Sequence, residues 1–428
     1  MKTIIIGGGL SGLASAYRLL KEDTSDVTIL EKGSEVGGMA ASYHIGNYHI
    51  EKYYHHIFES DSELINLMNE LGLGADLQWL KGTTGYHING KIYPMNTPIE
   101  LLKSPLSVPD LIRLARTVLV TRRAKDEEIY KLDCVTAKEW ILKNAGRSVY
   151  ERFFEPLLRS KFGSSHDRVS AAWLFGRIRI RSNRSTSGEK LGYLRGGFHR
   201  LVARLAESIE RMGGEIRTNC EASEIGIVDG SVSGVDAGGR RDCDSVISTV
   251  SPHALLKMVA DAPDIPYQGT ACALFGMNRP LMKDMYWLNI KSSVPFGAVI
   301  EHTNFIPVSD YGEHLVYVTA YFQDDTDPRW RASEQELIDS YLGGLLELFP
   351  GFHRDDVSWW RLARDIDTAP VYMTDYIKKI PPYSTDIEGL YLAGMFSRTN
   401  YPERSMNGSI LAGFGCAEEI RAQAHIRA

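Results

Sequence analysis

Residues 3–12 read TIIIGGGLSG, in which a β-branched run passes directly into three glycines and a fourth follows after two other residues. β-Branched residues are typical of strands, so residues 3–6 predict a strand that is buried on both faces. The segment 13–20, LASAYRLL, predicts a helix, and the segment 27–30, VTIL, predicts a second strand. This order predicts a βαβ unit with a glycine-rich turn after its first strand.

The turn matches the pattern G-x-G-x-x-G at Gly7, Gly9 and Gly12. In this pattern the first glycine permits the tight turn, and the second lets the backbone approach a pyrophosphate. The third allows close packing of the helix against the sheet. Leu10 and Ser11 start the predicted helix, whose N-terminal N–H groups and partial positive charge suit a phosphate. The residues therefore predict a dinucleotide site.

An acidic residue completes the pattern. Glu31 ends the second predicted strand, 19 residues after Gly12. A carboxylate at this position can accept hydrogen bonds from ribose hydroxyls. The fingerprint by itself does not separate NAD from FAD.

The next segment, residues 35–42, reads EVGGMAAS and contains a second glycine pair. It resembles the flavin amine oxidase superfamily, which includes monoamine oxidases, protoporphyrinogen oxidases and phytoene desaturases. The resemblance implies FAD as cofactor and an α/β fold, a Rossmann-type FAD-binding domain with an inserted mixed α+β substrate domain. It adds cofactor-binding positions at Lys32, Gly38, Met39 and Ala40. Family members often carry arginine where this chain has Met39.

Later segments, among them a small meander at 223–249, are similar to the same family. Residues 193–198, YLRGGF, precede an amphipathic helix at 201–212 and a strand that implies backbone contact with adenine at Ala222. Residues 389–395, GLYLAGM, resemble the last FAD strand, where Met395 follows Gly394 in place of the usual aspartate. Residues 404–413 resemble the helix start that faces the flavin ring. Its implied backbone contacts are Met406, Asn407 and Ile410.

Segment boundaries follow from these matches. FAD-binding segments are expected at 1–79, 185–262 and 387–428, and substrate-domain segments at 80–184 and 263–386. Asn89-Gly90 and Asp229-Gly230 each predict a hairpin with a type I′ turn. Gly238-Gly239 could turn the second hairpin again, towards a strand at 245–248. Residues 97–175 are expected to be mostly helical.

Composition excludes several classes of function. The chain has 428 residues with a net charge of −6, which gives no overall attraction to nucleic acid. Its five scattered cysteines suggest neither a disulfide framework nor a thiolate zinc site, and no metal site is expected. We expect a cytoplasmic protein acting on a small molecule, or one that lies on a membrane surface.

Residues 98–125 alternate apolar and basic side chains in a helical pattern. A basic amphipathic helix can lie in a membrane interface, which would give peripheral membrane contact. Helices of this kind more often pack their apolar side in the core. We expect packing here and keep membrane contact as the alternative.

Residues 177–184, RIRIRSNR, suggest a strand with its arginines on one face. Arg177, Arg179 and Arg181 could bind a carboxylate or phosphate of an anionic substrate. An exposed edge strand protected by charge explains the pattern equally well.

Two further segments contain candidate catalytic and substrate-binding residues. His55 and His56 follow Glu51, where the family brings a loop to the flavin edge. His56 is the candidate proton acceptor and His55 a substrate contact, while a structural role is open for both. Arg398 lies in the loop before the last helix and could hold an anion or polarise a carbonyl. A salt bridge to Glu403 is its alternative.

The predicted function is transfer of a hydride to FAD from a C–C or C–N bond of the substrate. The substrate is expected to be lipophilic or ring-shaped, and an anionic substrate is kept as an option. Amine oxidases of the family usually carry a lysine near the flavin, and the corresponding segment 270–277 has none. This favours the desaturase and protoporphyrinogen oxidase branch. The alternative is a non-redox flavoenzyme of the UDP-galactopyranose mutase type that acts on a nucleotide sugar.

Overall fold

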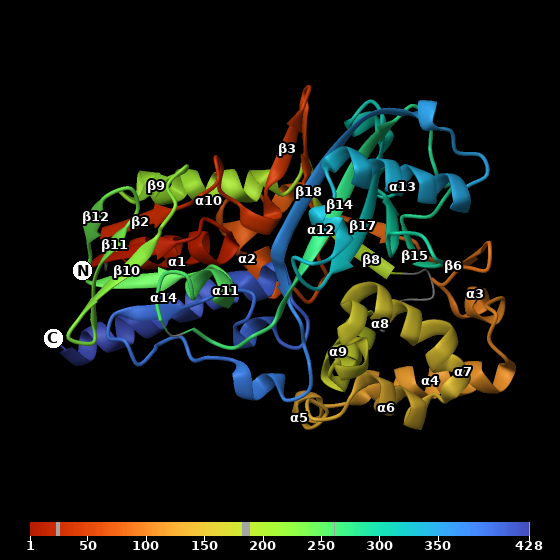
Figure 1. The fold of residues 1–428 in the computed structure, drawn as a ribbon, viewed down its shortest axis with the longest axis horizontal. Helices are drawn as coiled ribbons and strands as arrows, with labels where there is room; N and C mark the ends of the chain where they lie inside the picture. Colours follow the sequence, from red (N-terminus) through yellow and green to blue (C-terminus); the bar gives the residue numbers. More distant parts are fainter. Residues whose placement is uncertain (23–25, 182–188, 261, 428) are drawn as a thin grey trace. The chain divides into compact units, whose positions relative to one another are not determined.

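The computed structural model describes residues 1–22, 26–181, 189–260 and 262–427 (Figure 1). The chain divides into two compact units. The first comprises Met1–Gln78, Tyr193–Pro266 and Ile377–Ala428, and the second comprises Trp79–Gly192 and Tyr267–Tyr376. Each unit is therefore assembled from segments that are far apart in the sequence.

A five-stranded parallel sheet forms the centre of the first unit. Its order is β19 (Leu390–Leu392), β13 (Ser245–Ser248), β1 (Lys2–Ile6), β2 (Asp26–Leu30) and β9 (Glu215–Arg217). The strands predicted at β1, β2 and β19 are confirmed. Strand order reverses at β1, because β2 lies on one side of it and β13 on the other. In sheets of this type a ligand binds beyond the carboxyl ends of the strands at such a point.

Helices α1 (Leu10–Lys21), α10 (His199–Arg211) and α14 (Met406–Arg427) belong to this unit, and α1 contacts both of the others (Figure 1). The α10 sequence explains its place, because Leu201, Leu205 and Ile209 recur every four residues and are fully buried. The predicted helices are confirmed. Helix α2 (Ser62–Glu70) contacts α14.

A smaller antiparallel sheet joins β10 (Glu224–Val228), β11 (Ser231–Asp236) and β12 (Arg240–Asp242). Asp229 and Gly230 have φ of 50° and 81°, which confirms the type I′ turn between β10 and β11. The sequence suggested that the segment 245–248 would extend this sheet. It lies instead in the five-stranded parallel sheet, as β13. Every residue of β13 is buried, which suits an inner strand of the parallel sheet.

A buried carboxylate ties the hairpin of β3 (Ser42–Ile45) and β4 (Tyr48–Glu51) to the segment before α10. Glu51 is fully buried and accepts hydrogen bonds from the Phe198 N–H at 2.6 Å and the Tyr193 hydroxyl at 2.8 Å. Burial raises the pKa of Glu51. These hydrogen bonds offset the cost of burying the carboxylate.

The second unit is built on a seven-stranded sheet. Its order is β18 (Val357–Pro370), β14 (Tyr267–Met277), β17 (His314–Phe322), β16 (Ala298–Glu301), β15 (Trp287–Lys291), β6 (Thr84–Ile88) and β7 (Lys91–Pro94). Asn89 and Gly90 form the predicted turn between β6 and β7, with φ of 50° and 75°. Helix α13 (Glu334–Leu348) joins the apolar core with β14 and β17. A two-stranded ribbon of β5 (Leu77–Gly82) and β8 (Glu189–Leu194) completes the sheets.

The helical part of the second unit begins with α3 (Pro98–Leu102), α4 (Val108–Arg123), α5 (Asp126–Lys131) and α6 (Ala137–Asn144). It continues with α7 (Arg147–Val149), α8 (Glu155–Phe162) and α9 (Ala171–Arg181). The predicted helical character of residues 97–175 is confirmed. Residues 98–125 form two helices, and the expectation that their apolar side packs in the core is wrong for Ile112 and Leu119, which are exposed.

The prediction of a strand at 177–184 is also wrong, because helix α9 continues through Arg181. Residues 182–188 lie outside the described residues. Isoleucine and arginine alternate over only a few positions. The preceding residues 171–175, AAWLF, are all buried and form a packed helical start. A helix that is already nucleated extends at little cost, so packing overrides the local alternation.

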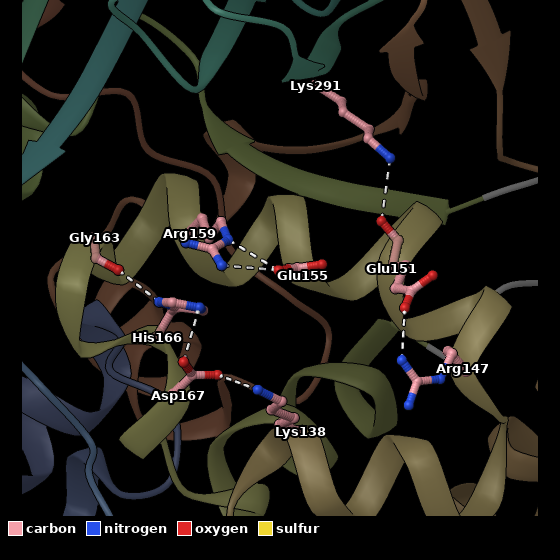
Figure 2. Close-up of polar contacts among 9 residues, drawn as sticks. All are labelled: Lys138, Arg147, Glu151, Glu155, Arg159, Gly163, His166, Asp167 and Lys291. Atoms are coloured by element: carbon pink, nitrogen blue, oxygen red, sulfur yellow. Dashed lines mark hydrogen bonds and ion pairs between the residues drawn. The ribbon is translucent and has the colours of Figure 1, made fainter.

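Polar contacts hold the helical part together and to the sheet (Figure 2). Lys138 of α6 pairs with Asp167 at 2.9 Å, and the other carboxylate oxygen of Asp167 lies 3.3 Å from His166 Nε2. Lys291 of β15 donates to the backbone carbonyl of Glu151 at 3.1 Å. Of these contacts, the Lys291 hydrogen bond is the one that links the helical part to the sheet.

Candidate functional site

Three glycines after β1 have three different physical roles. Gly7 has φ of 105°, which other residues rarely adopt. A Cβ on Gly12 would lie 2.0 Å from the Gly7 carbonyl oxygen, so Gly12 is required for close packing of α1. Gly9 has an ordinary φ of −72°, and a Cβ there would meet no atom nearer than Gly38 Cα at 4.0 Å. The protein itself does not need a glycine at position 9, and the open space suits the predicted pyrophosphate.

The first turn of α1 faces this space, and no acidic or capping side chain of the helix neutralises its N–H groups. Gly9 is the N-cap residue, no side chain caps the helix, and no acidic residue lies in its first turn. The N–H groups of such a turn, including those of Leu10 and Ser11, have no acceptor within the helix. Their partial positive charge can stabilise a phosphate. The Ser11 hydroxyl is used elsewhere, since it donates to the Ser409 carbonyl at 3.0 Å.

The second glycine pair lies directly against the first turn. Gly37 donates its N–H to the Gly8 carbonyl at 2.8 Å, and a Cβ on Gly38 would lie 3.1 Å from Gly9 Cα. Gly37 and Gly38 have φ of 122° and 55°, so both use glycine's conformational freedom. A 3-10 turn, Gly38–Ala40, follows, with Met39 partly exposed and Ala40 buried.

Glu31 stands between the two glycine segments. Its carboxylate accepts the Gly8 N–H at 2.8 Å and the Gly33 N–H at 2.7 Å, which fixes its orientation. Each oxygen keeps a further lone pair for a ribose hydroxyl. Lys32 is exposed.

The predicted strand around Ala222 is not formed. Ala222 lies in the irregular link between β9 and β10 and is partly exposed. The link is held beside Glu31, because the Cys220 N–H donates to the Glu31 carbonyl at 2.9 Å. A backbone contact of Ala222 with adenine remains a prediction. If it forms, a loop residue makes it, since Ala222 lies outside any strand.

The carboxyl end of β19 is joined to the start of α14 by a residue that the sequence did not single out. Asn400 is fully buried. Its amide donates to the Gly394 carbonyl at 3.1 Å, and its Oδ1 accepts the Ser405 N–H at 3.1 Å. The Ser397 hydroxyl accepts the Gly394 N–H at 3.0 Å. The turn containing Met395 is therefore set by side chains of the following loop.

We expect Asn400→Ala to destabilise the first unit by about 2–4 kcal/mol, because a buried carbonyl and an N–H lose their partners. Its FAD affinity should fall as well, since the start of α14 loses its anchor. Thermal denaturation and FAD titration of the purified variant test this. Asn144→Ala is a matched control, because it removes an exposed amide that donates only to the Trp140 carbonyl. Equal stability of the two variants would contradict this role of Asn400.

Helix α14 begins where the sequence predicts, at Met406. Ser405 accepts the Gly408 N–H at 2.9 Å, and Asn407 Oδ1 accepts the Leu64 N–H at 2.9 Å. The side chains of Met406 and Ile410 are buried, so only their backbone groups are suited to contact a ligand. With no acidic residue in its first turn, the helix start favours negative charge.

Helices α1 and α14 touch at backbone distance. A Cβ on Gly413 would lie 2.4 Å from the Ser11 carbonyl oxygen and 2.8 Å from the Ser15 nitrogen. The Ser15 hydroxyl lies 3.2 Å from the Gly413 carbonyl, to which it donates. This contact sets the distance between the N-termini of the two helices. In the predicted site, each N-terminus faces one end of the cofactor.

The two histidines after β4 differ in character. His55 Nδ1 lies 2.6 Å from the Tyr53 carbonyl, to which it donates. Burial lowers the pKa of His55 to about 4, and Arg404 contributes, so its ring is neutral at pH 7. The His56 ring packs edge-on against Phe58. Arg398 is exposed at the start of the turn Arg398–Asn400.

The predicted substrate arginines belong to the second unit. The Arg177 guanidinium lies 5.6 Å from the centre of the Trp173 ring, and the Lys161 ammonium lies 5.0 Å from it. Arg179 is partly buried, and the side chain of Arg181 lies outside the described residues. A role for the three arginines in substrate binding stays a prediction. Lys161, which is nearly buried, was not predicted.

Among the described residues, no group of three or more His, Cys, Asp or Glu side chains is arranged to hold a metal ion. No helix within the described ranges has the length and apolar character needed to cross a bilayer.

Comparison with known proteins gives a family match over almost the whole chain. Residues 10–421 match the model of flavin containing amine oxidoreductases. The chain is 23% identical to 15-cis-phytoene desaturase of Solanum lycopersicum, over 98% of this chain and 77% of that protein. It is 25% identical to flavin-containing amine oxidase A of Canis lupus familiaris, over 61% of this chain and 52% of that protein.

Solved structures share the fold. A candidate protoporphyrinogen oxidase from an Exiguobacterium species superposes with a TM-score of 0.79 at 18% identity, over 99% of both chains. Reduced UDP-galactopyranose mutase superposes with a TM-score of 0.72 at 17% identity, over 99% of this chain and 96% of that one. The predicted α/β fold is thereby confirmed.

Proposed function

The chain belongs to the family of flavin-containing amine oxidoreductases, and for this FAD-dependent oxidoreductase we propose that the hydride comes from a carbon–carbon bond of a lipophilic substrate. The observation that supports this most is the extent of the similarity. It spans 98% of the chain for phytoene desaturase and 61% for amine oxidase A. Strand β14, the counterpart of the segment that usually carries the amine oxidase lysine, has none between Tyr267 and Met277.

The residues of the first unit fit FAD. Gly9 leaves open space beside the first turn of α1, where the pyrophosphate would lie, and Glu31 offers its carboxylate to ribose. When bound, the flavin accepts the hydride. The first turn of α14, at Met406 and Asn407, would offer N–H groups and a partial positive charge to the pyrimidine edge.

Removal of a hydride from one carbon and a proton from its neighbour leaves a double bond, so the reaction requires a proton acceptor. Between the two histidines of the loop we assign this role to His56. The low pKa of His55 makes it a weak base, and its Nδ1 is engaged by the Tyr53 carbonyl. His55 would orient the loop through this hydrogen bond.

Anaerobic mixing of the oxidised enzyme with three probes tests the proposal. We expect phytoene in detergent micelles to bleach the flavin absorbance, and benzylamine and UDP-galactopyranose to leave it unchanged. His56→Gln should slow bleaching by about 10²–10⁴-fold if His56 is the proton acceptor, without loss of bound FAD.

Each other outcome contradicts a defined part of the proposal. Bleaching by benzylamine would show that the enzyme oxidises a C–N bond and would contradict the assignment to a carbon–carbon bond. No bleaching by phytoene, with conversion of UDP-galactopyranose only after reduction by dithionite, would favour the mutase alternative. Unchanged rates in His56→Gln would leave the redox assignment standing and remove His56 from it.

A further inference from the structure

Thr249 lies at the point of the parallel sheet where the strand order reverses. It directly follows β13, whose last residue, Ser248, pairs with Ile6 at the end of β1. A ligand of such a sheet binds beyond the carboxyl ends of the two strands that flank this point. The glycine pattern follows the β1 strand, and the half-buried Thr249 is its neighbour after β13.

The Thr249 hydroxyl contacts the first glycine of the pattern directly. Its Oγ1 lies 3.1 Å from the Gly7 carbonyl oxygen and 2.9 Å from the Ile6 carbonyl oxygen, so its hydrogen is shared between two acceptors. A Cβ on Gly7 would lie 2.6 Å from the same Oγ1. The backbone N–H of Thr249 also donates to the Ile6 carbonyl, at 2.9 Å. Thr249 therefore holds the turn where the chain leaves β1.

One peptide unit joins this contact to Glu31. The Gly7 carbonyl and the Gly8 N–H belong to the same trans peptide, so they point in opposite directions. The Thr249 hydroxyl donates to the carbonyl, and the N–H donates to Glu31 Oε2 at 2.8 Å. Thr249 thus fixes one end of the peptide whose other end holds the Glu31 carboxylate.

Hydrogen bonds are important at this peptide because glycine stands on both sides of it. Glycine has no Cβ and populates regions of φ and ψ that other residues avoid. Gly7 has φ of 105°, which is one of these regions. Side-chain sterics therefore do little to fix the peptide between Gly7 and Gly8. Its orientation depends on the hydrogen bonds to Thr249 and Glu31.

We propose that Thr249 is a positioning residue of the cofactor site, which acts through the Gly7–Gly8 peptide on the carboxylate of Glu31. The nucleotide half of FAD is the part affected, because Glu31 and the glycine-rich turn are the groups that Thr249 orients. The inference rests on the placement of FAD at this turn. It does not depend on the substrate, so FAD binding tests it separately from the proposed reaction.

Thr249→Val removes the hydroxyl and keeps the β-branched shape of the side chain. We expect FAD affinity to fall at least about tenfold, because the Gly7 carbonyl loses its donor and the peptide its fixed orientation. Thr249→Ser keeps a hydroxyl and should stay within about threefold of the original affinity. ADP-ribose has the adenosine and pyrophosphate of FAD without the flavin, and its affinity should fall by the same factor in Thr249→Val. Fluorescence titration with FAD, and competition by ADP-ribose, measure both in the full chain.

Thr385→Val is the matched control in the same unit. The Thr385 hydroxyl is also shared between two backbone carbonyls, those of Ile387 at 3.1 Å and Leu390 at 3.0 Å, and Thr385 is also half-buried. Leu390 is the first residue of β19, so this contact lies at the opposite end of the strands from Thr249. Thr385→Val should lower the melting temperature equally with and without FAD. Thr249→Val should instead reduce the rise in melting temperature that FAD produces.

The link through the peptide predicts that Thr249 and Glu31 are energetically coupled. In a Glu31→Ala background the Gly8 N–H has no carboxylate to hold. Thr249→Val should then weaken ADP-ribose binding by less than about threefold, against at least about tenfold in the original chain. Full additivity of the two substitutions would contradict an action through Glu31.

Other results would overturn the proposal as a whole. One is unchanged FAD affinity in Thr249→Val, and another is a loss of affinity that Thr249→Ser shares, since the hydroxyl would then not be the cause. An equal loss of FAD affinity in Thr385→Val would assign the effect to general destabilisation of the first unit. Stoichiometric FAD in folded Gly9→Val protein would show that the cofactor lies elsewhere, and would remove this proposal together with the predicted site.

Discussion

Gly9→Val is expected to abolish FAD binding while the protein stays folded. The valine Cβ would meet no protein atom nearer than Gly38 Cα at 4.0 Å, and the backbone at position 9 has φ of −72°, which valine adopts without strain. The side chain would instead fill the space before the first turn of α1, where the pyrophosphate has to approach the N–H groups. Loss of these contacts should lower FAD affinity by at least about a hundredfold, equivalent to roughly 3 kcal/mol.

Absorbance of the purified protein and titration with FAD measure this effect, and circular dichroism verifies the fold. Gly351→Val is the matched control, because Gly351 also has open space around it but belongs to the second unit. Gly12→Val offers a second comparison, since its Cβ would overlap the Gly7 carbonyl and should disturb the fold itself. Stoichiometric FAD in folded Gly9→Val protein would remove the cofactor site from this turn.

Gly413→Ala is expected to destabilise the first unit, although alanine usually stabilises a helix relative to glycine. A Cβ at this position would lie 2.4 Å from the Ser11 carbonyl oxygen and 2.8 Å from the Ser15 nitrogen. These are backbone atoms of α1, so the two helices would have to separate. Overpacking of this kind costs about 1–3 kcal/mol, which exceeds the gain of up to about 1 kcal/mol from helix propensity. FAD affinity should fall too, because the predicted site has the N-termini of α1 and α14 at opposite ends of the cofactor.

The same substitution in another helix should have the opposite sign. Gly343 lies within α13, and a Cβ there would meet nothing within 4 Å, so Gly343→Ala should stabilise the second unit by roughly 0.5–1 kcal/mol. Thermal denaturation followed by circular dichroism and by flavin fluorescence compares the two variants. Stabilisation by both, with unchanged FAD affinity, would refute the close contact of α1 and α14.

Local patterns predicted the elements whose geometry depends on short-range chemistry. Asn89-Gly90 and Asp229-Gly230 form type I′ turns, because both residues of such a turn need positive φ. The run of isoleucines before Gly7 forms an inner strand of the parallel sheet. Each of these features is decided within a few residues, so the sequence around it was sufficient.

The predictions failed where packing overrides local pattern. The alternation at 177–184 suggested a strand, but the buried residues before it commit the chain to helix α9 through Arg181. Helix α4 was expected to bury its apolar side, and instead buries Thr117 and Thr121, whose hydroxyls bond to their own helix. The sequence shows that a helix is amphipathic, but not which side the rest of the fold covers.

By itself, the sequence determined the glycine-rich turn after β1, the predicted nucleotide site, because Gly7, Gly9 and Gly12 act through the local backbone and can be recognised from their spacing. Only the tertiary structure decided what surrounds that turn. Gly38 meets Gly9, Gly413 meets Ser11, and Asn400 joins the ends of β19 and α14, across up to about 400 residues of chain. The physical reason is that glycine conformation is a property of one residue. A contact between helices or a shared hydrogen bond exists only when folding brings distant segments together.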